Sequence, residues 1–123
     1  MSIIIDHIVL PAYDHEAAAR FFAQIMGLEY GGPHRHFAPV QISETFNIAF
    51  IKAEQFQSYH LGFHIGEEDF DRILSRLQEA GVPYGNDPRE HSNMRTDHPF
   101  GGRGVFFLDP NNHLFEVMTK RRP

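Results

Sequence analysis

The chain has no cysteine and no tryptophan among its 123 residues. The lack of cysteine excludes disulfides, thiolate nucleophiles and sulfur-ligated metals, and it suits a cytoplasmic protein. Basic residues are also scarce: 11 Lys and Arg stand against 16 Asp and Glu, for a net charge of −5 with His neutral. This balance does not favour binding to nucleic acid or to an anionic membrane surface.

Long apolar runs are absent too. The opening run, MSIIIDHIVL, is cut short by Asp6 and His7 and has neither a basic region nor a cleavage site. No apolar stretch approaches the roughly 20 residues that span a bilayer. We therefore expect a soluble protein, and the length predicts a single domain over residues 1–123.

The chain does contain one pattern that occurs twice. A strand-like run around His7 precedes a helical run that ends at Gly27, and a strand-like run around His60 precedes one that ends at Gly81. The two histidines are 53 positions apart and the two glycines 54. The repeat predicts two modules within the domain, about 1–55 and about 56–123.

Apolar spacing at i, i+3, i+4 and i+7 predicts one helix between Asp14 and Gly27 and a second over Glu67–Ala80. Shorter strand candidates follow each helix. They are Leu28–Gly31, Phe37–Ser43 and Asn47–Glu54 in the first module, and Val82–Gly85, Gly104–Leu108 and His113–Thr119 in the second. The pattern therefore predicts an α+β fold of two βαβββ modules.

Three polar residues lie inside apolar, strand-like runs. His7 lies in IIIDHIVL, His60 in YHLGFHI and Glu116 in HLFEVM. Two imidazoles and a carboxylate directed away from water are costly unless something binds them. A single histidine in such a strand is usually a hydrogen-bonded core residue, but a divalent cation would bind all three at once.

These residues and their surroundings resemble the vicinal-oxygen-chelate superfamily, which includes glyoxalase I, fosfomycin- and bleomycin-resistance proteins and extradiol dioxygenases. The resemblance rests on DHIVLPAYDHEAAARFFAQIMGLEY, YHLGFHI and GRGVFFLDPNNHLFEVMTK. It implies an open, U-shaped mixed β-sheet with the helices on its outer face. It also implies that His7, His60 and Glu116 hold a divalent metal, with Fe(II), Mn, Zn and Ni all open. The resemblance also implies a homodimer, which is common among members of this size. In some of these members the first histidine of a site comes from the other chain.

Several positions depart from individual members. Glyoxalase I has a fourth ligand, a Glu, where this chain has apolar residues around Ile48–Phe50. Fosfomycin-resistance enzymes have a Thr where this chain has Val9, and extradiol enzymes have a Tyr where it has Phe106. Basic residues do follow Glu116, at Lys120, Arg121 and Arg122. The resemblance therefore selects no single reaction.

Residues 87–103 enlarge the second module with a polar run, REHSNMRTDHPFGGR. Such a loop is often only solvated surface, and the alternative is a lid over the metal. In that case His98 is the first catalytic candidate, as a general acid or base, and Arg103 the second, as a group that holds an anionic or enolate oxygen. His64 shares a strand face with His60 and is a candidate base or alternative ligand.

The function predicted from these residues is that of a metal-dependent enzyme for a small molecule. Two neighbouring oxygens of the substrate would chelate the cation, which acts as a Lewis acid in dioxygenase-like or lyase- and isomerase-like chemistry. The 12 phenylalanines suit an aromatic substrate. One alternative is a metal-free protein of the resistance type that binds or sequesters a small molecule. Another is a regulatory or scaffold domain that keeps a vestigial triad.

Overall fold

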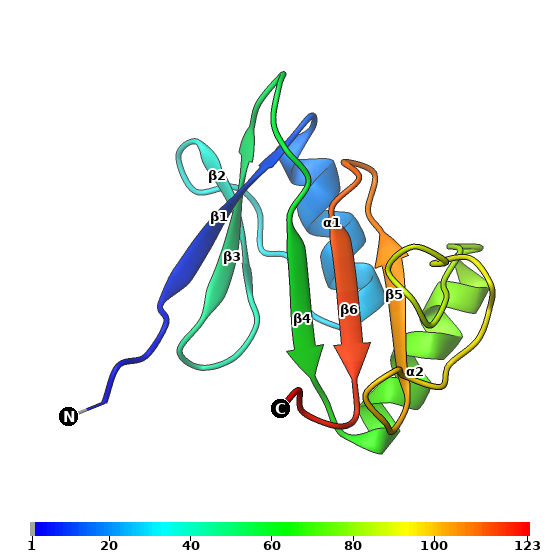
Figure 1. The fold of residues 1–123 in the computed structure, drawn as a ribbon. Coiled ribbons are helices and arrows are strands. Elements are labelled where there is room, and N and C mark those ends of the chain that lie inside the picture. Colours follow the sequence, from blue (N-terminus) through cyan, green and yellow to red (C-terminus); the bar gives the residue numbers. More distant parts are fainter. Residues whose placement is uncertain (1) are drawn as a thin grey trace. The chain divides into compact units, whose positions relative to one another are not determined.

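The structure is a computed structural model that describes residues 2–123. The chain divides into two compact units, Met1–Gln57 (unit 1) and Ser58–Pro123 (unit 2). Among the described residues, each unit contains three strands and one helix, in the order strand, helix, strand, strand (Figure 1). The α+β fold class predicted from the sequence is confirmed.

Unit 1 is built around β3 (Asn47–Lys52), which is the central strand of a three-stranded mixed sheet. β1 (His7–Ala12) pairs with β3 in parallel and β2 (Phe37–Gln41) pairs with it antiparallel. α1 (His15–Met26) contacts all three strands. The buried side chains of this helix are Ala18, Ala19, Phe22, Ala23 and Ile25.

Both ends of α1 lie where the sequence predicts them. Asp14 precedes the helix, and its Oδ1 accepts a hydrogen bond from the backbone N–H of Ala17 at 3.0 Å. Gly27 follows the helix with φ of 74°, a left-handed conformation that is free of steric cost only without a Cβ. The predicted limits of this helix are therefore confirmed.

Unit 2 repeats this topology. β6 (Leu114–Met118) is central, β4 (His60–His64) pairs with it in parallel, and β5 (Gly104–Leu108) pairs with it antiparallel. α2 (Glu67–Glu79) connects β4 to the long segment before β5. Its first turn carries three acidic residues, whose negative charges interact favourably with the positive end of the helix dipole.

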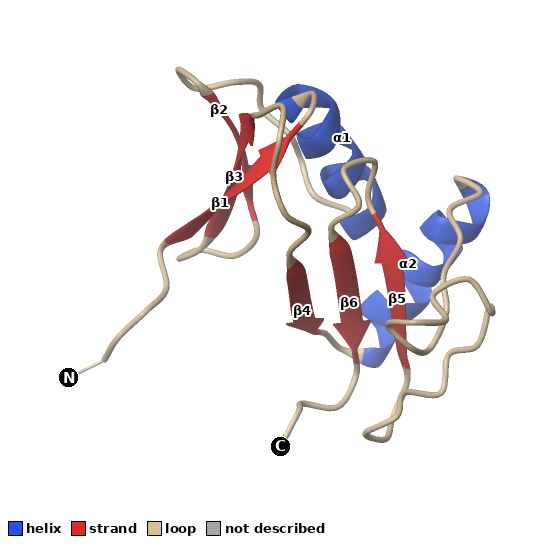
Figure 2. Ribbon diagram, turned by 45° about the horizontal axis from the view of Figure 1, so that its top comes forward, coloured by secondary structure: helices blue, strands red, loops and turns tan. Residues whose placement is uncertain are grey.

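The two faces of the sheet in unit 2 differ in character. One face is a hydrophobic core whose side chains are wholly buried: Val105, Phe107, Phe115 and Val117. α2 runs beside this sheet (Figure 2), and its side chains Phe70, Ile73 and Leu77 are buried. Strand alternation places His60, Phe106 and Glu116 on the opposite face. The polar residues of interest therefore lie on the face away from the core.

The structure corrects the strand prediction in two places. Leu28–Gly31 and Val82–Gly85 form no regular strand, and only Gly85 makes an isolated bridge, to Phe106. Glycines end the first segment, and Gly32 turns the chain with φ of 101°. Pro83 has no N–H to donate within the second segment. Each unit is therefore βαββ, one strand shorter than predicted.

The N-terminal apolar run is also shorter as a strand than its sequence indicates. β1 begins at His7, and Ile3, Ile4 and Ile5 precede it with relative exposures of 91%, 63% and 63%. The alternation of side chains between the two faces of a strand therefore applies to this run only from His7 onward.

Neither helix among residues 2–123 is long and apolar enough to cross a membrane. α1 has 12 residues and α2 has 13, whereas a spanning helix needs about 20.

Candidate functional site

The carboxylate of Glu116 is the centre of a polar cluster in unit 2. Its side chain is only 5% exposed. Oε1 lies 2.9 Å from Nε2 of His60, and Oε2 lies 2.5 Å from Nε2 of His98. Each carboxylate oxygen therefore has its own imidazole, which offsets the cost of burying the carboxylate.

Strand register explains why His60 reaches Glu116. β4 and β6 run in parallel with Gly62 opposite Glu116, so His60 lies two residues earlier on the same face. A Cβ at Gly62 would lie 2.9 Å from Cε of Met118 and 3.5 Å from Oε1 of Glu116. The absence of a side chain at Gly62 keeps the space beside the carboxylate open.

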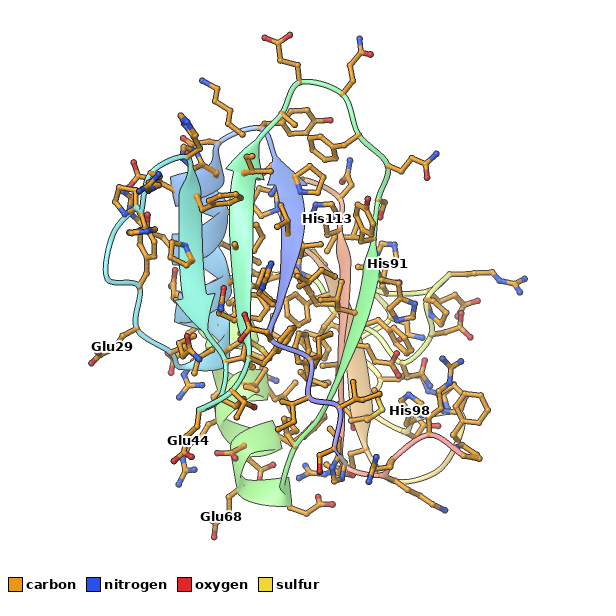
Figure 3. All side chains as sticks on the ribbon, turned by 90° about the vertical axis from the view of Figure 1, so that its left-hand side faces the viewer. Glu29, Glu44, Glu68, His91, His98 and His113 are labelled. Atoms are coloured by element: carbon orange, nitrogen blue, oxygen red, sulfur yellow. The ribbon has the colours of Figure 1, made fainter. Side chains whose placement is uncertain are left out.

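His98 reaches the cluster from the long loop between α2 and β5. Figure 3 shows it beside the end of β5 that follows this loop. Its side chain is 1% exposed, and its ring stacks on Phe106 with centroids 5.7 Å apart and planes at 19°. Nδ1 accepts a hydrogen bond from the backbone N–H of Phe100 at 3.1 Å. A Cβ at Gly104 would overlap the His98 ring, so glycine is required there.

A cavity of about 340 Å³ adjoins the cluster in unit 2. Its lining residues are His60, Gly62, His64, Glu116, Met118, Arg121 and Arg122. His64 is exposed, and its Nε2 lies 3.3 Å from the carbonyl oxygen of Thr119. The cavity therefore presents a carboxylate, two imidazoles and two guanidinium groups to a small molecule.

Arg103 is placed differently from its predicted role. Its Nε donates to Glu67 at 3.0 Å and its Nη1 donates to Asp71 at 2.8 Å, while its Cζ lies 4.5 Å from the ring centroid of Phe70. The hydrogen bond to Asp71, followed by that to Glu67, raises the pKa of Arg103 above its ordinary value. Arg103 is not among the residues that line the cavity. The guanidinium ties the loop to α2, which does not support the predicted oxyanion role.

His7 lies in unit 1, where it is the first residue of β1, just as His60 is the first of β4. Its side chain is 55% exposed, and its Nδ1 lies 2.9 Å from Oδ2 of Asp6. Asp6 precedes the strand, so strand alternation does not govern its direction.

A second cavity, of about 350 Å³, lies in unit 1. Its lining residues are His7, Val9, His34, Phe37, Pro39, Gln41, Asn47 and Ala49. Val9 pairs with Ala49 as Gly62 pairs with Glu116. Ala49 therefore occupies the position in unit 1 that Glu116 occupies in unit 2, and unit 1 offers no carboxylate there.

His60 and Glu116 fit a divalent cation by donor type and by spacing. Imidazole and carboxylate suit Zn, Fe, Mn and Ni. Two donors at about 2.1 Å from one ion and at a right angle are about 3 Å apart, and the two donor atoms here are 2.9 Å apart. Within residues 2–123, no three His, Cys, Asp or Glu side chains are already arranged around one point. A three-ligand metal site would therefore need a further ligand or a rearrangement of side chains.

Sequence reasoning missed two contacts in this region. The His98–Glu116 contact joins residues 18 positions apart and comes from a loop without periodicity, so no pattern predicts it. The glycines after His98, Gly101-Gly102 and Gly104, are a weak signal of a tightly turned segment. The Asp6–His7 contact joins neighbours in the chain, and the acidic residue beside a predicted ligand was the available signal.

Comparison with known proteins adds to this geometry. The family model described as Glyoxalase/Bleomycin resistance protein/Dioxygenase superfamily matches residues 4–117. The solved structure of Oxidase ChaP-H2 is 35% identical, with a TM-score of 0.91, over 98% of this chain and 96% of that chain. Oxidase ChaP-H1 is 30% identical, with a TM-score of 0.90, over 98% of both chains. Glutathione transferase FosA of Serratia marcescens is 22% identical over 120 residues, 92% of this chain and 78% of that protein.

Proposed function

The chain belongs to the glyoxalase/bleomycin resistance protein/dioxygenase superfamily, and from this membership we propose that it is a metal-dependent enzyme that acts on a small molecule. The observation that carries the proposal is the pair of donor atoms, His60 Nε2 and Glu116 Oε1, 2.9 Å apart at the wall of the cavity in unit 2. The two residues would hold a divalent cation.

His7 is the proposed third ligand. It begins β1 as His60 begins β4, so it holds the equivalent place in the repeated topology. Asp6 engages Nδ1 of His7, which leaves Nε2 for a metal. A carboxylate on the other ring nitrogen is the common support of a metal-bound histidine. The ligand would come from this chain or from the second copy in a homodimer.

A bound cation would act as a Lewis acid toward two neighbouring oxygens of the substrate. The other residues that line the cavity have separate proposed tasks. His64, exposed at the rim, would take or return a proton. Arg121 and Arg122 would attract an anionic oxygen of the substrate.

Among the reactions of the superfamily, we propose oxidation of an aromatic molecule. The support is the likeness to two structures named as oxidases, at 35% and 30% identity over nearly the whole chain. Ala49, the equivalent of Glu116 in unit 1, has no side-chain atom that can bind a metal. This argues against the four-ligand site expected for glyoxalase I chemistry. A two-histidine, one-carboxylate set with open positions is associated with non-haem Fe(II) oxygenases.

A second candidate function is the binding of a small molecule without metal or chemistry. The cavity in unit 1 supports it, because Val9, Phe37, Pro39 and Ala49 give it a largely apolar lining. An apolar cavity with few polar groups is typical of a ligand site. This function predicts ligand uptake that is indifferent to chelators.

Oxygen consumption separates the two functions. Metal-free protein would be supplied with Fe(II) under argon and then mixed with oxygenated buffer and a panel of catechols and hydroxylated polycyclic aromatics. We expect uptake that needs both metal and substrate, and that falls at least 100-fold in Glu116→Gln, because that variant has no anionic ligand oxygen. Substrate binding without turnover, equal in both proteins and unchanged by chelator, would instead favour the binding function.

A further inference from the structure

We infer that His98 is a positioning residue: it holds one oxygen of Glu116 so that the other is presented to the cation. This inference rests on the proposed function and assigns a role to the loop before β5. The sequence alone makes His98 a candidate general acid or base. The contacts of both its ring nitrogens give it a different task.

The backbone fixes which nitrogen of His98 carries the hydrogen. Nδ1 accepts the N–H of Phe100 at 3.1 Å, so Nδ1 has no hydrogen of its own. The neutral ring must then carry its hydrogen on Nε2, which lies 2.5 Å from Oε2 of Glu116. His98 therefore donates to the carboxylate. Its only lone pair is occupied by Phe100, so it can serve neither as a metal ligand nor as a base.

The surroundings of the ring leave it little freedom to turn. Phe106 stacks on one side of it, and Phe100 lies at 5.7 Å between centroids. Gly104 lies so close that any side chain there would overlap the ring. The site is thus built around an imidazole of one orientation.

The backbone on both sides of His98 is also anchored. The N–H of His98 donates to the carbonyl of Gly102 at 3.1 Å, and the N–H of Gly104 donates to Thr96 at 2.8 Å. Gly101 and Gly102 have φ of 98° and 66°, so the tight turn depends on glycine. These contacts hold the backbone of His98 close to the start of β5. This part of the loop therefore supports Glu116.

The two carboxylate oxygens of Glu116 therefore have different partners. Oε2 is engaged by His98, while Oε1 lies beside His60. Glu116 also lines the cavity. A carboxylate held in this way offers one oxygen to a cation, which leaves more positions for the two oxygens of a substrate. Loss of the second partner of a metal-bound carboxylate typically costs 10–100-fold in metal affinity.

The first test measures metal affinity by competition with a chromophoric chelator, using Mn(II) and Zn(II). We expect His98→Ala to bind each metal about 10–100-fold more weakly than wild type. His98→Gln, whose amide can still donate to Glu116, should recover part of the loss. His91→Ala removes a histidine from the same loop and should match wild type, and melting temperatures establish that each variant is folded.

The outcomes separate this inference from the proposed function. Tight binding by wild type and equal binding by a folded His98→Ala would overturn the positioning role and leave the proposed function standing. Failure of wild type to bind any metal would overturn the proposed function instead.

A second test needs no metal. Long-range ¹H–¹⁵N correlation of metal-free wild type reports which nitrogen of each histidine carries hydrogen, and His98→Gln assigns the signal. We expect His98 to carry a slowly exchanging hydrogen on Nε2 and none on Nδ1. A hydrogen on Nδ1, or rapid exchange of the ring hydrogen with water, would overturn the inference.

Discussion

At the scale of single residues, the site depends on what is absent at position 62. Gly62 leaves a gap between His60 and His64 on β4, directly opposite Glu116 on β6. The nearest neighbours of a hypothetical Cβ would be the end of Met118 and the carboxylate itself. A side chain at position 62 would therefore occupy part of the cavity beside Glu116.

Gly62→Val should close the site while it preserves the fold. Valine suits a strand, and the Met118 side chain that it would meet is flexible at its end, but its two methyl groups would occupy the space beside Oε1 of Glu116. We expect metal affinity to fall by at least 10-fold, with a melting temperature within a few degrees of wild type. Gly31→Val is the matched control, since nothing lies within 4 Å of a Cβ at that position. Undiminished metal binding by Gly62→Val would show that the cation binds elsewhere.

At the scale of elements, the sequence predicted the regular segments well and the loop poorly. β5 covers its predicted range, Gly104–Leu108, and α1 begins and ends at its predicted caps. Such segments are predictable because local periodicity and capping determine them. The strand predictions for Leu28–Gly31 and Val82–Gly85 are wrong because glycine and proline outweigh a weak strand preference. The position of His98 depends on contacts with Gly104 and Phe106, which no local pattern encodes.

The loop itself is held by a small polar network. Nη2 of Arg95 donates to Oδ2 of Asp97 at 2.9 Å, and Nδ2 of Asn86 donates to Oδ1 at 3.1 Å. The hydrogen bonds from Arg95 lower the pKa of Asp97 below its ordinary value. The network lies directly before His98 in the chain, so it helps to fix the position of that residue beside Glu116.

The lowered pKa of Asp97 predicts a pH-dependent contribution to stability. A carboxyl group whose pKa is lower in the folded state stabilises the fold above its unfolded pKa, about 4, and this contribution is lost as the pH falls through the folded pKa. Asp97→Asn should therefore melt slightly lower than wild type at pH 6, and the difference should shrink as the pH falls below about 4. Calorimetric melting of both proteins from pH 6 to pH 3 provides the check. A difference that grows on acidification would contradict the assigned sign.

At the scale of the whole molecule, one topology occurs twice but the chemistry is unequal. The strand orders β1-β3-β2 and β4-β6-β5 are the same, and His7 and His60 open equivalent strands. The equivalents of Gly62 and Glu116 in unit 1 are Val9 and Ala49. Unit 2 therefore contains the carboxylate and its support, whereas unit 1 contains a histidine and an apolar cavity.

The resemblance recognised in the sequence was correct at this scale, because the family model covers residues 4–117. It named His60 and Glu116 as a pair, and the structure brings them to hydrogen-bonding distance. It could not supply the contact of His98 with Glu116 or of Asp6 with His7, because these depend on how this particular chain turns outside its strands.

The stoichiometry of metal binding shows whether His60 and Glu116 hold a divalent cation. Metal-free wild type, His60→Ala, Glu116→Ala and the loop control His91→Ala would be dialysed to equilibrium against Fe(II) under argon and against Mn(II), Zn(II) and Ni(II), and bound metal measured by mass spectrometry. We expect one tightly bound ion per chain for wild type and His91→Ala, and loss of that ion from folded His60→Ala and Glu116→Ala. If wild type binds none of the four metals, or if Glu116→Ala binds one ion as tightly as wild type, the proposed metal site is wrong.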